Sequence, residues 1–442
     1  MNDLKRNVLQ DDIESVLNYT DPFGGEIEIN AILHTKDLDI EITDVISVDI
    51  ASDYFNDITD KIHFNFVMGK GDYVLDVFPH KDNMLITLSY KLRGVTKTRQ
   101  YRFILLDNLE NIQGSRLDNM SREEMNQEDL LNITGQCLNM TVEALRLKEV
   151  SGVYRNVTVE TVIEGLFANV MNRTKVLGVE LNVSVNFKPT NNEYSYDHIV
   201  IPSGLKLLDL PSYLQDTDYG VYNGDIGVYF TKTEDKDVLY IYPLYGGDYI
   251  NDKQMKVVLL NSDSDITENA GQTHMFTNDT LKILVGKSAN SKNDGETALL
   301  DKAVGYRMLK PTVPLSRAVI VTDDTISTDV KANMGSSLLK AKEDGVNRQA
   351  IIKPTANEFK VRSTFLRNNM RDLTLKWMMS EHDLIVPGTR IEHMYVDEYE
   401  TLQRRQGVIS HINTRLTTDS GIDEKNTQAM SVLNVLIEKD ER

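Results

Sequence analysis

The sequence predicts a mainly β protein with a smaller share of α+β elements. Apolar and polar residues alternate through several consecutive segments of 44–107, and the same period of two returns within 180–250 and from residue 373 onwards. Side chains two apart on a strand share a face, so each segment offers one apolar face to a core. Only 159–170 shows a strong helical period. We therefore expect sheets to form most of the fold, with short helices inserted between them.

The alternation in 44–107 predicts five strands separated by turns. Glycines at 69–72 tolerate positive φ, and at 79–83 a proline precedes side chains that bond their own backbone. The apolar positions of the five segments are Ile46, Val48 and Ile50; Ile62, Phe64 and Phe66; Val74 and its neighbours before Pro79; Ile86 and Leu88; and Phe103 and Leu105.

A linker and the clearest helix of the chain follow. Residues 111–129 are polar with little periodicity, which predicts a connection between domains, and strands are expected at 138–142 and 151–154. Thr158 is then placed as the N-cap of a helix with an apolar stripe that faces a core. The stripe consists of Val159, Val162, Ile163, Leu166, Phe167 and Val170.

Residues 180–250 combine strands with a tyrosine-rich pattern. A strand at 181–187, a short apolar segment at 205–214 and a hairpin of 226–230 with 238–243 are expected. Two interpretations of the tyrosines stay open. Either the tyrosines are core residues of a half-buried sheet, or their ring faces form a platform for sugars. The tyrosines are Tyr213, Tyr219, Tyr222, Tyr229, Tyr240, Tyr242, Tyr245 and Tyr249.

The rest of the chain predicts further strands. Between residues 251 and 350 they are weakly marked, and 288–296 has the composition of a flexible loop. A Pro-Gly turn at 386–389 gives the C-terminal part a clearer pattern, with a charged excursion at 397–406. The predicted strands are 256–260, 281–285, 318–321, 357–365, 373–379, 390–396, 407–417 and 430–437.

Charge and composition argue against several functions. With 67 acidic and 48 basic side chains the net charge is −19, and the basic residues are scattered, whereas a protein that grips nucleic acid concentrates them. The single cysteine, Cys137, excludes an intramolecular disulfide and a cysteine-based zinc site, and we expect it to be a buried small hydrophobe. No stretch approaches the roughly 18 apolar residues of a membrane span, and the charged N-terminus is unlike a signal peptide, which predicts synthesis and folding in a cytoplasm.

No motif for catalysis, metal or cofactor binding passes inspection. Gly286–Ser288 resembles the end of a phosphate-binding loop, but Leu281 stands where that loop needs glycine. Asn261–Asp265 offers alternating oxygen ligands, but Ile266 replaces the glycine of a calcium loop. The eight histidines do not fall at zinc-binding spacings. We therefore predict no catalytic residue, no cofactor and no metal, although a triad or a carboxylate pair assembled from distant segments stays open.

Three parts of the chain resemble the baseplate hub proteins of contractile-tailed phages. The first is the polar apex at 51–60, followed by a strand, a turn at Pro79 and the restart Asp82-Asn83-Met84. The second is the Ile-Pro-Ser lead at 201–203, with its short helix, a Tyr-Gly-Val-Tyr step at 219–222 and a closing hairpin. The third is the C-terminal succession of Pro-Gly turn, strand, charged excursion and final strands.

This resemblance implies a domain plan. It consists of an N-terminal segment (1–25), a first tube-like β-barrel domain (26–110), a linker (111–129), a second tube-like β domain with a helix insertion (130–250), an uncertain insertion or connecting domain (251–355) and a small C-terminal β-barrel (356–442).

The resemblance also implies a function. The protein would be a structural and non-enzymatic hub in the tail baseplate of the virion, assembled in the host cytoplasm. Its homotrimeric ring would join the tail tube to the central spike around a DNA channel with an acidic lining. The implied partners are itself, a tail tube or tube-initiator protein, a central spike protein, baseplate wedge proteins and the tape measure protein, without sequence-specific nucleic acid binding. The alternative is a tail-borne β protein that binds or hydrolyses glycans.

Overall fold

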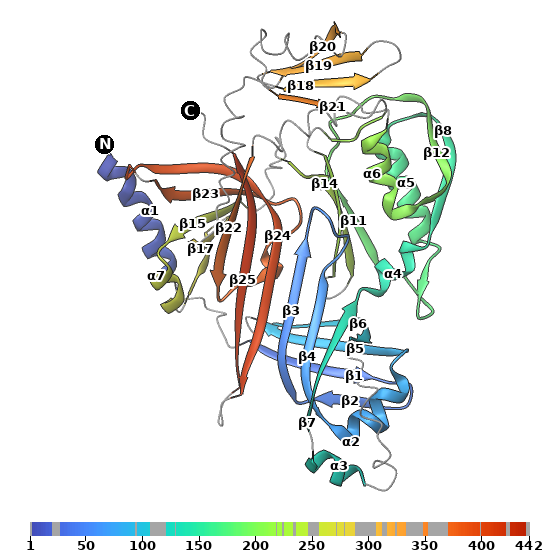
Figure 1. Ribbon diagram of the computed structural model, residues 1–442, viewed down its shortest axis with the longest axis vertical. Coiled ribbons are helices and arrows are strands. Elements are labelled where there is room, and N and C mark those ends of the chain that lie inside the picture. Colours follow the sequence, from blue (N-terminus) through green and yellow to red (C-terminus); the bar gives the residue numbers. More distant parts are fainter. Residues whose placement is uncertain are drawn as a thin grey trace.

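The computed structural model confirms the mainly β class with α+β elements (Figure 1). It has an N-terminal unit (27–138), a middle unit (139–245) and a C-terminal ring of strands from 256–287 and 370–438. The structure describes residues 2–19, 27–92, 95–106, 121–128, 130–217, 219–222, 225–232, 236–245, 256–270, 272–277, 279–287, 306–311, 316–322, 325–332, 348–351, 370–397, 399–420 and 425–438. The predicted strand at 357–365 and loop at 288–296 lie outside these residues.

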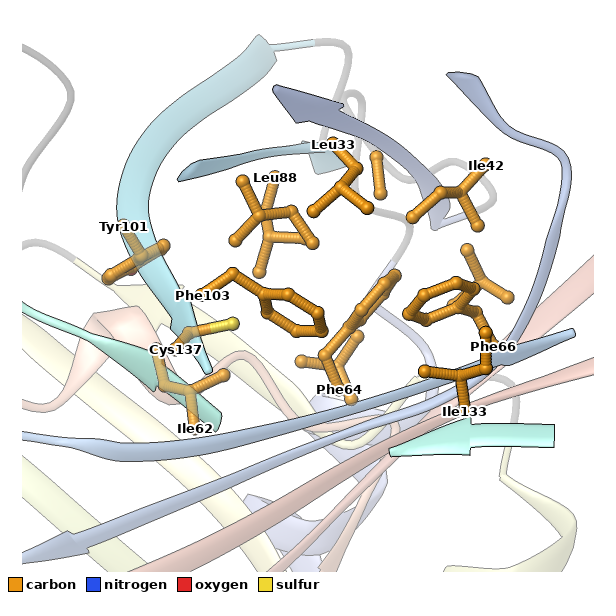
Figure 2. Packing of buried hydrophobic residues seen from close by; sticks show 14 of the residues in the cluster. Leu33, Ile42, Ile62, Phe64, Phe66, Leu88, Tyr101, Phe103, Ile133 and Cys137 are labelled. Carbon is orange, nitrogen blue, oxygen red and sulfur yellow. The ribbon is translucent and has the colours of Figure 1, made fainter. Parts of the chain in front are cut away.

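The N-terminal unit is an antiparallel sheet that curls around one apolar core. The alternation predicted most of its inward residues, but a register shift between Val45 and Ser47 places Val45 in the core and leaves Ile46 only partly buried. Phe64, Phe66 and Phe103 pack together at the centre (Figure 2). Cys137 lies in the same core, as predicted, and burial raises the pKa of its thiol. In spatial order the strands are β2 (Asp39–Ile42), β1 (Glu28–His34), β5 (Met84–Leu92), β6 (Val95–Leu105), β7 (Leu130–Leu138), β4 (Lys61–Gly69) and β3 (Asp44–Asp53).

Two local predictions in this unit are wrong. The turn at 69–72 and the strand around Val74 are instead one helical run: α2 (Lys70–Asp72), η1 (Tyr73–Val77) and η2 (Phe78–His80). Tyr73 and Val77 are both buried, because residues four apart share a helix face. The Asn126 side chain binds the start of the run by accepting from the Gly71 and Asp72 amides at 2.8 and 3.2 Å.

Asn126 belongs to α3 (Arg122–Glu128), which lies in the predicted linker 111–129. Because β7 pairs with both β4 and β6, the predicted boundary at 129/130 does not coincide with the end of the N-terminal sheet. The strand predicted at 138–142 is also wrong. Asn139 stops β7 and caps α4 (Met140–Arg146) by accepting from the Thr141 and Val142 amides.

The middle unit consists of small sheets covered by helices. Val162, Ile163 and Phe167 of the predicted helix are buried, and Thr158 caps it as expected. Among the described residues of 130–250, strand pairing does not close a second tube-like sheet; the strands after β7 form separate small sheets, against which helices pack. The elements are β8 (Glu149–Val157) with β12 (Tyr196–Lys206), β9 (Lys175–Val176) with β10 (Val179–Glu180), β11 (Val183–Phe187) with β14 (Asp237–Pro243) and β13 (Ile226–Lys232), and the helices α4, α5 (Val159–Met171), η5 (Leu207–Asp209) and α6 (Leu210–Asp216).

The C-terminal ring is closed by the pairing of its long strands β24 and β25. It draws on two distant segments, so it coincides neither with the predicted domain 251–355 nor with 356–442. Trp377 lies fully buried in its interior. Around the ring the strands are β24 (Leu402–Ser420), β23 (Arg390–Val396), β15 (Lys256–Ser262), β17 (Thr280–Lys287), β22 (Met370–Met378) and β25 (Lys425–Glu438).

Smaller elements flank the ring. Helix α1 (Asn2–Leu17) lies along its outside, where Leu9 and Val16 cover apolar residues of β15, β17 and β23 (Figure 1). Strand β16 (His274–Thr277) pairs with β17, and α7 (Ser264–Asn269) precedes it. A separate sheet holds β18 (Tyr306–Pro311), β19 (Ser316–Thr322), β20 (Thr325–Ala332) and β21 (Arg348–Ile351). The short helix η6 (His382–Leu384) lies between β22 and β23.

The N-terminal unit and the C-terminal ring share one sheet. Strand β3 pairs with β24 over 47–53 and 411–417, so the main-chain ladder runs through both units without a break. We call this pairing the seam. In Figure 1 the long strands β24 and β25 lie beside β3 and β4, which shows how the two units meet edge to edge.

Gly407 provides a test of the ring's close packing. A Cβ there would stand 2.3 Å from the Leu436 carbonyl oxygen and 3.1 Å from the Ile437 Cα, both backbone atoms of β25. Gly407→Ala is therefore expected to destabilise the protein by about 1–3 kcal/mol in urea unfolding. Gly165→Ala is the matched control, because nothing lies within 4 Å of its Cβ position on α5. It is expected to be stabilising by about 0.5–1 kcal/mol. Equal effects of the two substitutions would contradict this account.

Candidate functional site

One continuous polar face extends across the seam. Residues directly opposite one another in adjacent strands share a face of the sheet. The registers therefore place outward side chains of six neighbouring strands, from β22 to β7, on one surface. We call this surface the polar face. It consists of Thr374 and Lys376 on β22, Val432 and Asn434 on β25, His411, Asn413 and Arg415 on β24, Asp49, Ala51 and Asp53 on β3, Lys61, His63 and Asn65 on β4, and Thr134 and Gln136 on β7.

The charges on the polar face are balanced. Arg415 lies 3.4 Å from Asp49 across the seam, and Lys61 lies 2.8 Å from Asp57. Lys376 pairs with Glu268 at 3.2 Å. Each of these basic side chains thus has an acidic partner, and most other members are neutral amides and hydroxyls. Such a balanced surface gives phosphates no concentrated positive field to bind.

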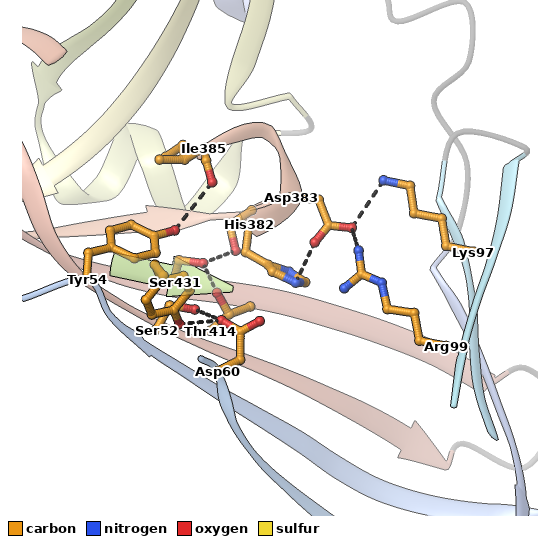
Figure 3. A network of polar contacts seen from close by, with 12 residues as sticks. Ser52, Tyr54, Asp60, Lys97, Arg99, His382, Asp383, Ile385, Thr414 and Ser431 are labelled. Carbon is orange, nitrogen blue, oxygen red and sulfur yellow. Dashed lines mark hydrogen bonds and ion pairs between the residues drawn. The ribbon is translucent and has the colours of Figure 1, made fainter. Parts of the chain in front are cut away.

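A buried ionic cluster lies where the three units meet. Asp383, in the η6 turn of the C-terminal ring, accepts from Arg99 Nη2 at 2.8 Å and from Lys97 Nζ at 3.1 Å. Both cations come from β6 of the N-terminal unit, and Figure 3 shows them reaching the carboxylate from one side, with His382 on the other. His382 Nε2 lies 2.8 Å from Asp383 Oδ1. The cluster therefore links the two units away from the seam.

The environment keeps Asp383 ionised. Burial alone would raise the pKa of this carboxyl, but the charge and hydrogen bond of His382, together with Arg99 and Lys97, hold the pKa well below its usual range. The side chains of Arg99 and Asp383 are 6% and 10% exposed, so water screens this ion pair weakly. A buried pair of this kind depends on each partner to compensate the other.

Tyrosines join the middle unit to the same junction. Tyr229 donates to Asp60 Oδ1 at 2.7 Å and packs edge-on against Tyr54 with ring centroids 4.9 Å apart. Tyr54 donates to the Ile385 carbonyl at 3.3 Å, and Tyr242 donates to the Tyr54 carbonyl at 2.7 Å. Burial, followed by the charge of Asp60, raises the pKa of Tyr54 and of Tyr229, so both remain neutral donors.

These contacts bear on the two interpretations of the tyrosine cluster. Buried rings have no face left to stack on a sugar, and the others that the structure describes pack partly buried against the same cores, which favours core packing. The buried members are Tyr222, Tyr229, Tyr242 and Tyr245, and the partly buried ones are Tyr213, Tyr219 and Tyr240. Tyr249 lies outside the described residues.

A pocket of about 270 Å³ opens at the junction. Side chains of all three units line it, and charged groups are prominent among them. The lining residues are Ser52, Tyr54, Asp60, Lys97, Arg99, Thr231, Lys232, Tyr240, His382, Asp383, Ile385 and Val386.

The sequence motifs that were considered and rejected do not meet at this junction. Gly286 and Lys287 lie in β17 and pair with β22, while Asp263 and Asp265 stand at the start of α7. Within the described ranges no group of three or more histidine, cysteine, aspartate or glutamate side chains is placed to hold a metal. None of the helices that the structure describes is long and apolar enough to cross a membrane.

The histidines are dispersed in the structure. Among the described histidines without a carboxylate contact, His393 is the most deeply buried. Burial, followed by the charge of Arg371, lowers its pKa to about 4. It therefore stays neutral at neutral pH. Those near carboxylates are His34, His80, His274, His382 and His411, whereas His63 and His198 lie exposed on strands.

Sequence reasoning missed the junction residues, although one signal for Arg99 is present. Arg99 precedes Tyr101 and Phe103 at the two-residue period whose other members face the core. A charged residue at a core-facing position requires a buried partner. That signal gives the charge of the partner but not its place in the chain, and Asp383 lies 284 residues away.

Among solved structures, the chain is similar to the tail protein from Neisseria meningitidis MC58, with 12% identity, a TM-score of 0.44, and coverage of 92% of this chain and 96% of that one. It is similar to the 43 kDa tail protein of prophage MuSo2 from Shewanella oneidensis, with 12% identity, a TM-score of 0.45 and coverage of 92% and 97%. A Francisella PdpA-VgrG complex gives 10% identity, a TM-score of 0.43 and coverage of 99% and 62%.

No curated protein matches the chain. A family model does match: that of the bacteriophage PBS1 gene 109 protein, over residues 102–331. This match extends from β6 through the whole middle unit to β20 and spans more than half of the sequence. It confirms the expectation of a phage protein, and the chain belongs to the bacteriophage PBS1 gene 109 protein family.

Proposed function

We propose that the protein is a structural, non-enzymatic baseplate hub of a contractile phage tail. In this role three copies close into a ring around a DNA channel, and the ring joins the tail tube to the central spike. Membership of a phage family and the hub-like pattern of 51–60, 201–222 and 386–437 support the proposal. The proposed location is the tail baseplate of the virion, after assembly in the host cytoplasm.

The observation that carries the proposal is the polar face. A channel wall needs a broad, rigid surface without exposed main-chain edges, and the seam provides it by joining two units into one sheet. Cyclic symmetry closes such walls into rings. Three subunits, each contributing the N-terminal unit and the C-terminal ring that share this sheet, would present six units to a six-fold tube. The balanced charges of the face would let DNA pass without being held.

The partners follow from that position. They are further copies of the chain in a homotrimer, the tail tube or tube-initiator protein, the central spike protein, baseplate wedge proteins and the tape measure protein. No sequence-specific contact with nucleic acid is proposed.

The test combines particle mass with the position of the polar face. Light scattering, with and without the neighbouring tail protein, is expected to give the mass of a trimer. A gold cluster attached through Asn413→Cys should appear on the ring axis in electron micrographs, because Asn413 lies exposed on the polar face. Cys137 is buried with a raised thiol pKa, so it should not react.

Glu164→Cys is the matched control for this labelling. Glu164 is exposed on α5 of the middle unit, and gold there should appear away from the axis. A chain that stays monomeric with its tail partners present would overturn the proposal. A ring in which both labels lie at the periphery would overturn the assignment of the polar face to the channel.

A further inference from the structure

The hairpin of β9 and β10 ends in a leucine with a strained backbone. Val176 pairs with Val179, so Leu177 and Gly178 form a two-residue turn. Both have positive φ, 50° for Leu177 and 83° for Gly178, as in a type I′ turn. Asparagine and glycine suit such positions, whereas the left-handed region is uncommon for a residue with a bulky side chain. The backbone of Leu177 therefore adopts a conformation that its own side chain disfavours.

Burial within the chain does not compensate for this strain. Leu177 is 62% exposed, and Val179, the next residue but one, is 69% exposed. A Cβ added to Gly178 would have nothing within 4 Å, so the tip of the hairpin is open on that side as well. Strained backbone is concentrated at functional sites, and exposed apolar groups gain free energy when a partner buries them. The tip therefore has the properties of a contact that forms between proteins.

The hairpin has a small excess of positive charge. Arg173 and Lys175 precede its turn, and its one acid, Glu180, lies opposite Lys175 in the ladder. Arg173 and Lys175 are exposed, and neither forms an ion pair within the part of the chain that the structure describes. The hairpin packs against α4, which ends with a third exposed cation, Arg146, and whose acid already pairs with β6. A partner with exposed carboxylates would therefore complement this surface.

Helix α1 has such a surface. Asp11 and Glu14 are exposed on the side of the helix that faces away from the ring, and neither forms an ion pair with another described residue. Val8 and Leu17 are exposed apolar side chains of the same helix. Both basic residues of α1 come before Val8 in the sequence. From Val8 onwards, α1 therefore combines exposed carboxylates with exposed apolar groups.

The two surfaces lie on opposite flanks of the molecule. In Figure 1, α4, which the hairpin contacts, and α1 are on opposite sides of β25, β24, β3 and β4, the strands that carry most of the polar face. Closed rings of three copies have heterologous interfaces, in which two different surfaces of neighbouring copies meet. We propose that the β9–β10 hairpin of one copy docks on α1 of the next, with Leu177 against its apolar side chains and Arg173 and Lys175 against its carboxylates. This inference rests on the proposed function, because it assigns a contact between copies in the ring.

The first test is Leu177→Asn in the full chain. Asparagine tolerates positive φ, so this substitution should not lower the urea midpoint of the chain. It should nevertheless weaken self-association by about tenfold or more, because the apolar tip is lost. Light scattering over a range of concentrations, with and without the neighbouring tail protein, measures the association. Leu38→Asn is the matched control and should leave it unchanged, because Leu38 is 49% exposed in the loop between β1 and β2 and has a negative φ.

Charge reversal tests the two surfaces together. Arg173→Glu with Lys175→Glu, and Asp11→Lys with Glu14→Lys, should each weaken association by about fivefold or more. The chain with all four substitutions should recover part of this loss, because opposite charges then face each other again. Trp377 fluorescence reports whether each variant is folded.

The outcomes separate this contact from the ring itself. A trimer that Leu177→Asn does not weaken, or losses that simply add when all four charges are reversed, would overturn the proposed contact and leave the ring in place. Leu177→Asn that weakens only the binding of the neighbouring tail protein would overturn the assignment of the hairpin to a second copy. A chain that stays monomeric under all conditions would overturn both the contact and the ring.

Discussion

Asp383→Asn is expected to lower the free energy of unfolding by about 3–5 kcal/mol, because it removes one partner of a buried ion pair. Asparagine has nearly the same shape, so packing changes little. What is lost is the charge that compensates Arg99 and Lys97, which would remain buried beside a neutral amide. Desolvated cations cannot recover this energy from water, since Arg99 is almost fully enclosed.

The pH dependence of this effect has a definite sign. The pKa of Asp383 is lowered in the folded protein, so its contribution to stability is fully present above the unfolded pKa of about 3.9. It is lost as the pH falls through the folded pKa. The asparagine variant has no such dependence. The difference in stability between the two proteins should therefore be constant at neutral pH and shrink only below about pH 4.

Urea unfolding followed by the fluorescence of Trp377 measures this difference. Trp377 is the only tryptophan, is fully buried in the C-terminal ring and precedes Asp383 by six residues. Asp372→Asn is the control, because Asp372 lies exposed on β22, the strand that carries Trp377. It should change stability by no more than about 0.5 kcal/mol. If the two substitutions have equal effects, the ionic cluster does not link the units as described.

Local signals made some elements predictable from sequence. The helix from Val159 has a cap and an apolar stripe that need no distant partner, and the structure confirms both. Strands at 256–260 and 281–285 were also predictable, because a run of apolar residues bounded by polar ones favours a buried strand wherever it pairs.

Other elements depend on competing signals. Residues 138–142 alternate like a strand, but the Asn139 side chain caps two amides and starts a helix there. Around Val74 the apolar residues satisfy a helical period as well as a strand period, and Asn126 of a distant helix stabilises the helical start. In both places one hydrogen-bonding side chain accompanies the alternative structure.

The long-range pairing of strands could not be predicted from the sequence. The seam joins 47–53 to 411–417. The C-terminal ring combines strands that come before and after the separate sheet β18–β21 in the sequence. Period-two alternation tells which face of a strand is apolar but not which strand lies beside it. The domain plan derived from contiguous segments therefore differs from the observed units. For the same reason the polar face, which spans six strands, could not be predicted from the sequence.

The seam leads to a second large expected effect. Phe64→Ala should destabilise the protein by about 3–5 kcal/mol, because the lost ring leaves a cavity in a packed core. Phe64 is fully buried, stacks on Phe66 with centroids 5.3 Å apart, and meets the edge of Phe103 at 6.4 Å (Figure 2). The effect lies in the N-terminal unit, far along the chain from Trp377.

The two probes of unfolding should nevertheless respond together. If the seam and the Asp383 cluster make the N-terminal unit and the C-terminal ring one cooperative body, Phe64→Ala shifts the urea midpoint of Trp377 fluorescence as much as that of far-ultraviolet circular dichroism. Leu130→Ala on β7 is the control, since Leu130 is 72% exposed and its truncation should cost no more than about 0.5 kcal/mol. An unmoved Trp377 transition beside an earlier dichroism step would mean that the units unfold separately. In that case the continuous ladder through β3 and β24 would not by itself make the proposed channel wall rigid.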